Sequence, residues 1–228
     1  MSGIVRFYRA SIGKKVIMAV TGIILSAYVF VHMIGNLKVF AGAEALNHYA
    51  EWLREGMGEP ILMPYQGLWI ARIVLLVAVG LHVVTGVQLW LMARAGKPVG
   101  YTQKKVVPAT YLAQMMRLGG ILIGLFIVYH ILHFTTGSAL PEFVYGDVYH
   151  NVIVGFRNPL ASLFYLAALA ALGVHLFHGD WSLFQTLGLN NRKYDMVWRA
   201  VSAFIAVAVV IGNALIPIAV LAGFLTLT

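Results

Sequence analysis

Residues 16–37 read VIMAVTGIILSAYVFVHMIGNL, an apolar run that no Asp, Glu, Lys or Arg interrupts. A helix that spans a membrane needs about 20 such residues. The run is longer than the apolar core of a secretory signal peptide, which has about 7–15 residues, and no small-residue cleavage site is evident after it. It therefore predicts a first transmembrane helix that the protein retains.

The same pattern recurs along the chain. Hydrophobic residues make up 61% of the sequence, charged residues only 11%, and the mean hydropathy is +0.84, which excludes an ordinary soluble globular protein. We predict one all-α integral membrane domain over 1–228 with five transmembrane helices, at 16–38, 68–93, 118–137, 159–180 and 199–226. Asn158-Pro159 is a typical helix start, and Ala43 to Glu55 (AEALNHYAEWLRE) predicts a short interfacial helix.

The distribution of basic residues predicts the orientation. With the N-terminus inside, twelve Lys and Arg residues lie on the inner side and four (Lys38, Arg54, Arg72 and Arg157) on the outer side. This positive-inside bias predicts that the N-terminus is inside and the C-terminus outside. It also explains the net charge of +8 without nucleic acid. The chain has no cysteine, which excludes disulfides, thiolate-bound iron–sulfur clusters and covalently attached haem c.

Each of the first four predicted spans contributes one histidine to a candidate set. These are His32, His82, His130 and His175. An ionisable side chain within a membrane is by default a functional hypothesis. Imidazoles from two facing helices can occupy both axial positions of a haem iron, so four helices can hold two haems b in a helical bundle. Tetrahedral zinc is a poorer fit, because the sequence places no carboxylate or cysteine in the membrane interior beside these histidines.

Two of these positions have an alternative. His133 follows His130 by three residues and His178 follows His175 by three, so each pair shares roughly one helix face and spacing does not choose the ligand. The other histidines, His48 and His150, are expected at the surface, with lining of a quinone pocket as an alternative for His48.

Several stretches resemble one family of membrane proteins. They are SIGKKVIMAVTG at 11–22, FVHMIGN at 30–36, AGAEALNHY at 41–49, LHVVTG at 81–86, RLGG at 117–120, VYH at 128–130 and VHLFHGDWSLFQTLG at 174–188. Their order and spacing resemble those of the single-chain cytochrome b subunit of type B succinate:quinone oxidoreductases, the b558 family of succinate dehydrogenases and fumarate reductases. The resemblance covers nearly the whole chain.

The resemblance implies a haem-binding bundle of five helices with two haems b stacked across the membrane. It implies that His82 and His175 hold the inner haem, and that His32 and His130 hold the outer one. Arg117, thirteen residues before His130, favours that histidine over His133, and Gly179 of the GxWS sequence favours His175 over His178. Haem propionates need cationic or hydroxyl partners, and Lys15 and Arg117 are candidates at the inner membrane edge.

The resemblance also implies a function in the cytoplasmic membrane of a prokaryote. The chain would anchor a flavoprotein subunit and an iron–sulfur subunit on its inner face, without dehydrogenase chemistry of its own. It would pass electrons through haem to a quinone, for which the family favours menaquinone. The inner loops at 103–105 and 190–193 are candidate docking surfaces. Asp180 is interpreted either as a solvated helix end or as a contact for quinone or the iron–sulfur partner.

Two other functions compete with this one. A different dihaem membrane cytochrome b, such as a b561-like carrier or the b subunit of a hydrogenase or formate dehydrogenase, also places histidine pairs on facing helices. A haem-free transporter would use the histidines to relay protons, and it predicts no haem absorption.

Overall fold

The computed structural model describes residues 3–96 and 108–227, without the side chains of residues 4 and 108–113. Within these ranges the chain forms helices and connecting turns and no strand. The helices are α1 (Gly3–Arg9), α2 (Ser11–Asn36), the 3-10 helix η1 (Leu37–Ala41), α3 (Ala43–Glu55), α4 (Gln66–Ala95), α5 (Pro108–Phe134), α6 (Val148–Arg157), α7 (Pro159–Thr186) and α8 (Asp195–Leu221).

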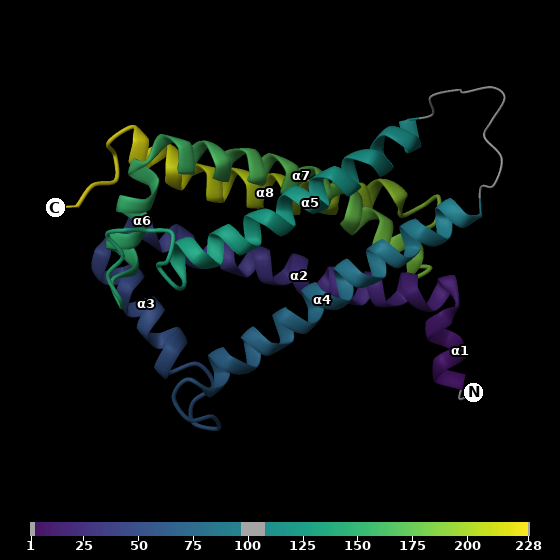
Figure 1. Ribbon diagram of the computed structural model, residues 1–228, viewed down its shortest axis with the longest axis horizontal. Coiled ribbons are helices and arrows are strands. Elements are labelled where there is room, and N and C mark those ends of the chain that lie inside the picture. The colour runs from purple at the N-terminus through teal and green to yellow at the C-terminus, as the bar shows by residue number, and fades with distance from the viewer. Residues whose placement is uncertain (1–2, 97–107, 228) are drawn as a thin grey trace.

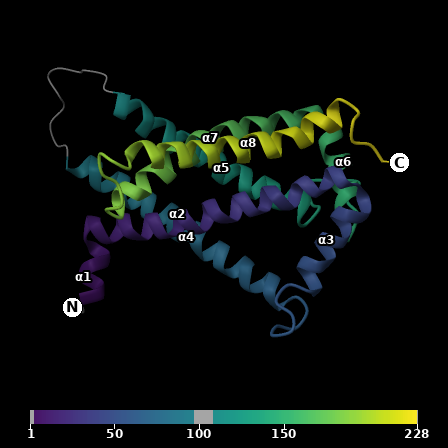
Figure 2. The ribbon, with the colours of Figure 1, turned by 180° about the vertical axis from the view of Figure 1, so that it is seen from behind.

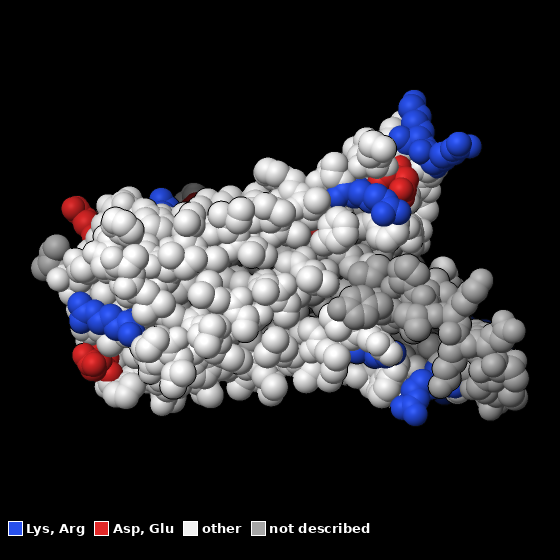
Figure 3. All heavy atoms as spheres, turned by 90° about the horizontal axis from the view of Figure 1, so that it is seen from above, with Lys and Arg blue, Asp and Glu red and all other residues white. Residues whose placement is uncertain are grey.

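Five of these helices are long and apolar enough to cross a membrane, namely α2, α4, α5, α7 and α8. They run along the long axis of the molecule, with α7 and α8 side by side and α4 crossing the others obliquely (Figures 1 and 2). The two termini lie at opposite ends of the bundle, and we name the ends after them. Figure 3 shows charged side chains at both ends and an uncharged surface between them. The prediction of an all-helical protein with five apolar spans is confirmed.

The helix boundaries differ from the predicted spans in particular places. The fourth span, predicted to end at residue 180, continues as α7 to Thr186. The fifth, predicted to reach residue 226, ends as α8 at Leu221, just before Gly223 with a φ of +77°. Three short helices were not predicted, α1, η1 and α6. The predicted helix at Ala43–Glu55 is confirmed as α3.

Local capping explains how the two helices beside the C-terminal end begin. The Asn158 side chain accepts hydrogen bonds from the backbone N–H groups of Leu160 and Ala161, and Pro159 occupies the first turn of α7. Asp147 caps α6 in the same way through the N–H of His150. Each cap satisfies backbone donors that have no partner inside the helix. The predicted helix start at Asn158-Pro159 is therefore confirmed.

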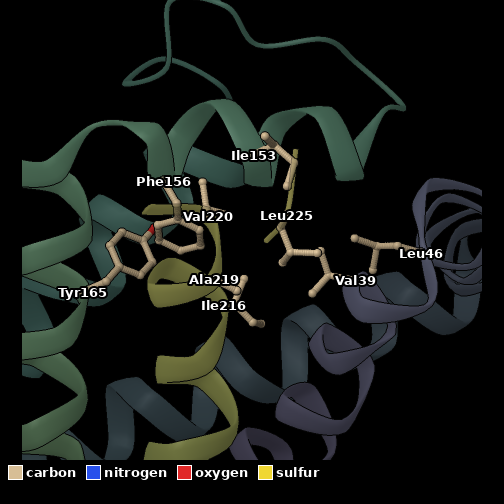
Figure 4. Close-up of a cluster of buried hydrophobic side chains, with 9 residues drawn as sticks. All are labelled: Val39, Leu46, Ile153, Phe156, Tyr165, Ile216, Ala219, Val220 and Leu225. Carbon is tan, nitrogen blue, oxygen red and sulfur yellow. The ribbon is translucent and has the colours of Figure 1, made fainter. Parts of the chain in front are cut away.

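A buried apolar cluster joins the helices at the C-terminal end (Figure 4). It brings together side chains of η1, α3, α6, α7, α8 and the segment that follows α8, namely Val39, Leu46, Ile153, Phe156, Tyr165, Ile216, Ala219, Val220 and Leu225. Nearer the middle of the bundle, Asn36 donates a 3.0 Å hydrogen bond to Asn213 and so joins α2 to α8. Helices α7 and α8 approach closely at Gly173, where an added Cβ would lie 2.6 Å from Val210 Cγ2. These contacts hold the long helices in register around the histidines.

Candidate functional site

The four histidines predicted as ligands meet in two pairs across the bundle. His32 of α2 and His130 of α5 have ring centroids 5.9 Å apart, with their planes at 90°. His82 of α4 and His175 of α7 have centroids 6.2 Å apart, with their planes at 57°. Each pair joins two helices that are far apart in the sequence. The pairs are the same ones that the resemblance implies, while their role as haem ligands stays a prediction.

The separation of the rings is compatible with a metal ion between them. An imidazole nitrogen lies about 2 Å from a bound transition metal, so two rings on opposite sides of one ion have centroids about 6 Å apart. Both pairs are close to that value. Within the described residues, no three His, Cys, Asp or Glu side chains form a group that could hold a metal ion.

A threonine fixes the orientation of one ring in the His82–His175 pair. Thr21 Oγ1 lies 3.1 Å from His82 Nδ1 and 2.8 Å from the carbonyl oxygen of Ile17. The hydroxyl proton goes to the carbonyl, so Thr21 Oγ1 accepts from the Nδ1–H of His82. The neutral ring then has its lone pair on Nε2. A ligand whose other ring nitrogen donates to a fixed acceptor is the usual arrangement for a metal-bound histidine.

Unsatisfied polar atoms also gather at this pair. In the described part of the chain, three buried side-chain atoms have no hydrogen-bond partner: Thr85 Oγ1, His175 Nδ1 and Asn190 Oδ1. Thr85 follows His82 by three residues and so shares its helix face. Two of the three atoms thus belong to the His82–His175 site, where buried polar atoms are normally satisfied.

Glycines leave room beside the same two rings. A Cβ on Gly22 would lie 3.8 Å from His82 Cε1, and a Cβ on Gly120 would lie 3.8 Å from His175 Cε1. Small residues at these positions let helices α2 and α5 approach the imidazoles. The residues present therefore fit a flat ligand held between two histidines.

The His32–His130 pair is held by aromatic side chains. His32 stacks on Tyr28, with ring centroids 5.3 Å apart and planes at 19°. His130 Nδ1 lies 3.3 Å from the hydroxyl of Tyr165. This pair therefore also has one ring anchored by a hydroxyl, as His82 is by Thr21.

The structure separates the alternatives that spacing left open. His130 faces His32, whereas His133 is buried against α6, where a Cβ on Gly155 would lie 3.0 Å from its Cε1. On α7, His175 faces His82, whereas His178 lies against Trp181 with ring centroids 6.1 Å apart. The geometry thus favours His130 and His175 as the members of each pair.

The two cations expected to contact propionates lie toward the N-terminal end. Lys15 is exposed, and the Arg117 guanidinium lies 5.9 Å from the ring centroid of Trp90. The neighbouring Lys14 is buried, and its Nζ donates a 2.8 Å hydrogen bond to the carbonyl oxygen of Tyr8. The contacts described for Arg117 and Lys14 are with aromatic rings and backbone, so propionate binding stays a prediction.

Asp180 corrects one part of the sequence interpretation. It lies within α7, six residues before the helix ends, and is only 5% exposed. Its Oδ2 accepts a 3.0 Å hydrogen bond from Ser26 Oγ of α2. The interpretation of Asp180 as a solvated helix end is therefore wrong.

His48 and His150 lie away from the pairs, at the C-terminal end. His48 lines an open cavity of about 530 Å³ together with residues of α3 and of the two neighbouring loops, including Glu44, Glu51, Tyr65 and Tyr145. His150 Nε2 lies 3.1 Å from the carbonyl oxygen of Glu142. Both histidines are accessible, as expected.

Sequence reasoning missed Thr21 and Tyr165. The available signal was a hydroxyl side chain inside an apolar span, but several spans contain one, and only the packing shows which of them face a histidine. Comparison of the chain with protein family models, with curated proteins and with solved structures found no match.

Proposed function

We propose that this chain is the membrane-anchor cytochrome b subunit of a succinate:quinone oxidoreductase, with two haems b held by the pairs His32–His130 and His82–His175. The observation that carries the proposal is the meeting of four half-buried histidines from four different helices in two pairs about 6 Å apart. The sequence stretches that resemble the b558 family favour a succinate:quinone oxidoreductase over other complexes that contain a dihaem cytochrome b.

The residues of each site have distinct roles in this proposal. A haem b iron with two axial imidazoles takes up and releases single electrons without an open coordination position. His82 would bind through Nε2 while Thr21 fixes its ring, and His130 would bind in the same way beside Tyr165. The apolar helices around both sites would keep water away from the haems, and ligand identity, burial and hydrogen bonding would set the reduction potentials.

The partners and the orientation belong to the same proposal. Basic side chains described at the N-terminal end would face the inside of the cell and meet the flavoprotein and iron–sulfur subunits. They are Arg6, Arg9, Lys14, Lys15, Arg94, Arg117, Arg192, Lys193 and Arg199. Lys97 and the predicted docking loop at 103–105 lie outside the described residues. Quinone, with menaquinone favoured by the resemblance, would exchange electrons with the haems.

The test is isolation of the complex from membranes that express a tagged form of this chain with its genomic partners. We expect co-purification of a protein with covalent flavin, and reduction of b-type haem absorption when succinate is added. The matched control is His48→Leu, which removes an exposed histidine and should change neither result. Nickel- or molybdenum-containing partners would indicate another dihaem cytochrome b, and a folded protein without a Soret band would favour a haem-free transporter.

A further inference from the structure

The hydroxyl of Tyr165 lies between two histidines of the neighbouring helix. Tyr165 Oη is 3.3 Å from His130 Nδ1 and 3.1 Å from His133 Nδ1. His133 is only 2% exposed, and Tyr165 is 5% exposed. Two buried groups and the half-buried His130 therefore share these hydrogen bonds.

Packing fixes the position of this hydroxyl. The Tyr165 ring meets Phe126 and Phe156 edge to face, each with ring centroids 4.9 Å apart and planes close to perpendicular. Figure 4 shows Tyr165 of α7 beside Phe156 in the apolar cluster. The ring of Tyr129 stacks on His133 with centroids 5.1 Å apart. Neither Tyr165 nor His133 can turn away without disturbing this cluster.

Donor counting assigns the protons of the three groups. A phenol hydroxyl has one proton to donate and lone pairs that accept. In a neutral imidazole, one ring nitrogen donates a proton and the other accepts one. If His130 binds a metal through Nε2, its proton is on Nδ1 and is donated to Tyr165. The hydroxyl proton of Tyr165 is then donated to Nδ1 of His133, which carries its own proton on Nε2. With Nε2 of His130 occupied, this order lets Tyr165 Oη accept from one histidine and donate to the other.

We infer that His133 and Tyr165 are positioning residues of the His32–His130 site, and that His133 acts on His130 through the Tyr165 hydroxyl. The inference rests on the proposed function, since it concerns haem ligation by His130. The hydrogen bond from Nδ1 makes His130 a more basic ligand, which stabilises ferric over ferrous haem. Donation to His133 polarises the Tyr165 hydroxyl and strengthens its acceptance from His130.

The test is a redox titration of the purified complex carrying Tyr165→Phe, His133→Leu or His133→Asn. Tyr165→Phe should change the relative affinity for ferric and ferrous haem about tenfold, which raises the midpoint potential of the His32–His130 haem by about 59 mV. His133→Leu should raise the same potential by less, because Tyr165 still accepts from His130. His133→Asn, whose amide oxygen can replace Nδ1 as acceptor, should restore the wild-type value.

Thr21→Val is the matched control at the other pair. It removes the acceptor of His82 and should shift only the potential of the His82–His175 haem. Electron paramagnetic resonance of the ferric complex assigns each shift to one low-spin signal. A purely structural role of Tyr165 or His133 would lower stability without moving one potential selectively.

The outcomes separate this inference from the proposed function. A folded wild-type complex without haem contradicts both. A complex with two haems whose potentials Tyr165→Phe and His133→Leu leave unchanged overturns the inference alone. The inference is also overturned if both substitutions of His133 remove a haem while His130→Leu retains it, because His133 would then be the ligand.

Discussion

Ser26 Oγ of α2 donates a 3.0 Å hydrogen bond to Asp180 Oδ2 of α7, and both side chains are buried. A carboxyl group inside a membrane-spanning bundle is costly unless its oxygens are hydrogen-bonded. The pair therefore fixes the relative position of two helices that each carry a histidine of the proposed sites, His32 and His175.

Removal of Ser26 should destabilise the protein. Ser26→Ala leaves Asp180 without this donor, and we expect a loss of about 1–3 kcal/mol in the free energy of unfolding. Asp180→Asn keeps an acceptor oxygen for Ser26 and should cost less. Thermal unfolding in detergent measures both changes, with the exposed Ser138→Ala as control. Equal stability of Ser26→Ala and the wild type would show that the bond contributes nothing.

Hydropathy predicted the long helices because each needs about 20 apolar residues to span a membrane. Such a run can be recognised in the local sequence without knowing which helices pack against it. The shorter α1 and α6 lack that signal. The last six residues of α7 were missed for a different reason. Asp180 is typical of a solvated helix end, and its donor Ser26 lies on another helix, so only the packed structure shows that it is buried.

Space beside His175 provides a second prediction. A Cβ at Gly120 would make an ordinary 3.8 Å contact with His175 Cε1, so Gly120→Ala should retain both haems. Gly120→Val adds branches that displace the ring, and should lose most of the haem at the His82–His175 pair. Gly80 has no atom within 4 Å of an added Cβ and is the matched control. Equal haem content of Gly120→Val and Gly80→Val would contradict the contact.

A third prediction concerns pH at the C-terminal end. Partial burial raises the pKa of Asp147, but hydrogen bonds from the His150 backbone N–H and the Asn47 amide outweigh it, so the pKa lies below its ordinary value of 3.8. The charged group therefore stabilises the folded state above that value, and the stabilisation is lost as pH falls through the lowered pKa. The protection of the α6 amides from hydrogen exchange, relative to the intrinsic exchange rate at each pH, should fall in this range.

The control for this titration is Asp147→Asn, which can still cap α6 but has no carboxyl to protonate. In this variant, the protection of the α6 amides from hydrogen exchange should no longer depend on pH between the ordinary pKa of an aspartate and the lowered pKa of Asp147. An identical acid dependence in the variant and the wild type would assign the effect to other groups.

The pairing of the histidines provides a fourth prediction. His32→Leu and His130→Leu should each remove the same haem signal, and His82→Leu and His175→Leu should each remove the other one. His178→Leu should retain both, because His178 faces Trp181. Low-temperature difference spectra of the variants distinguish the two haems. Loss of the same haem in His32→Leu and His82→Leu would contradict the pairs seen in the structure.

The sequence predicted which four spans carry an internal histidine, but spacing alone did not choose between His130 and His133, because residues three apart share a helix face. The direction of each side chain depends on its neighbours across the bundle. His133 packs against Gly155 of α6 whereas His130 faces His32, and the sequence near residue 133 shows neither relationship.

The most direct test of the central claim is the haem content of the purified wild-type protein by pyridine haemochrome assay, with protein quantified by amino-acid analysis. Two histidine pairs predict two haems b per polypeptide. One haem would show that one of the two pairs is not a binding site, and a folded protein with no haem would contradict the account as a whole.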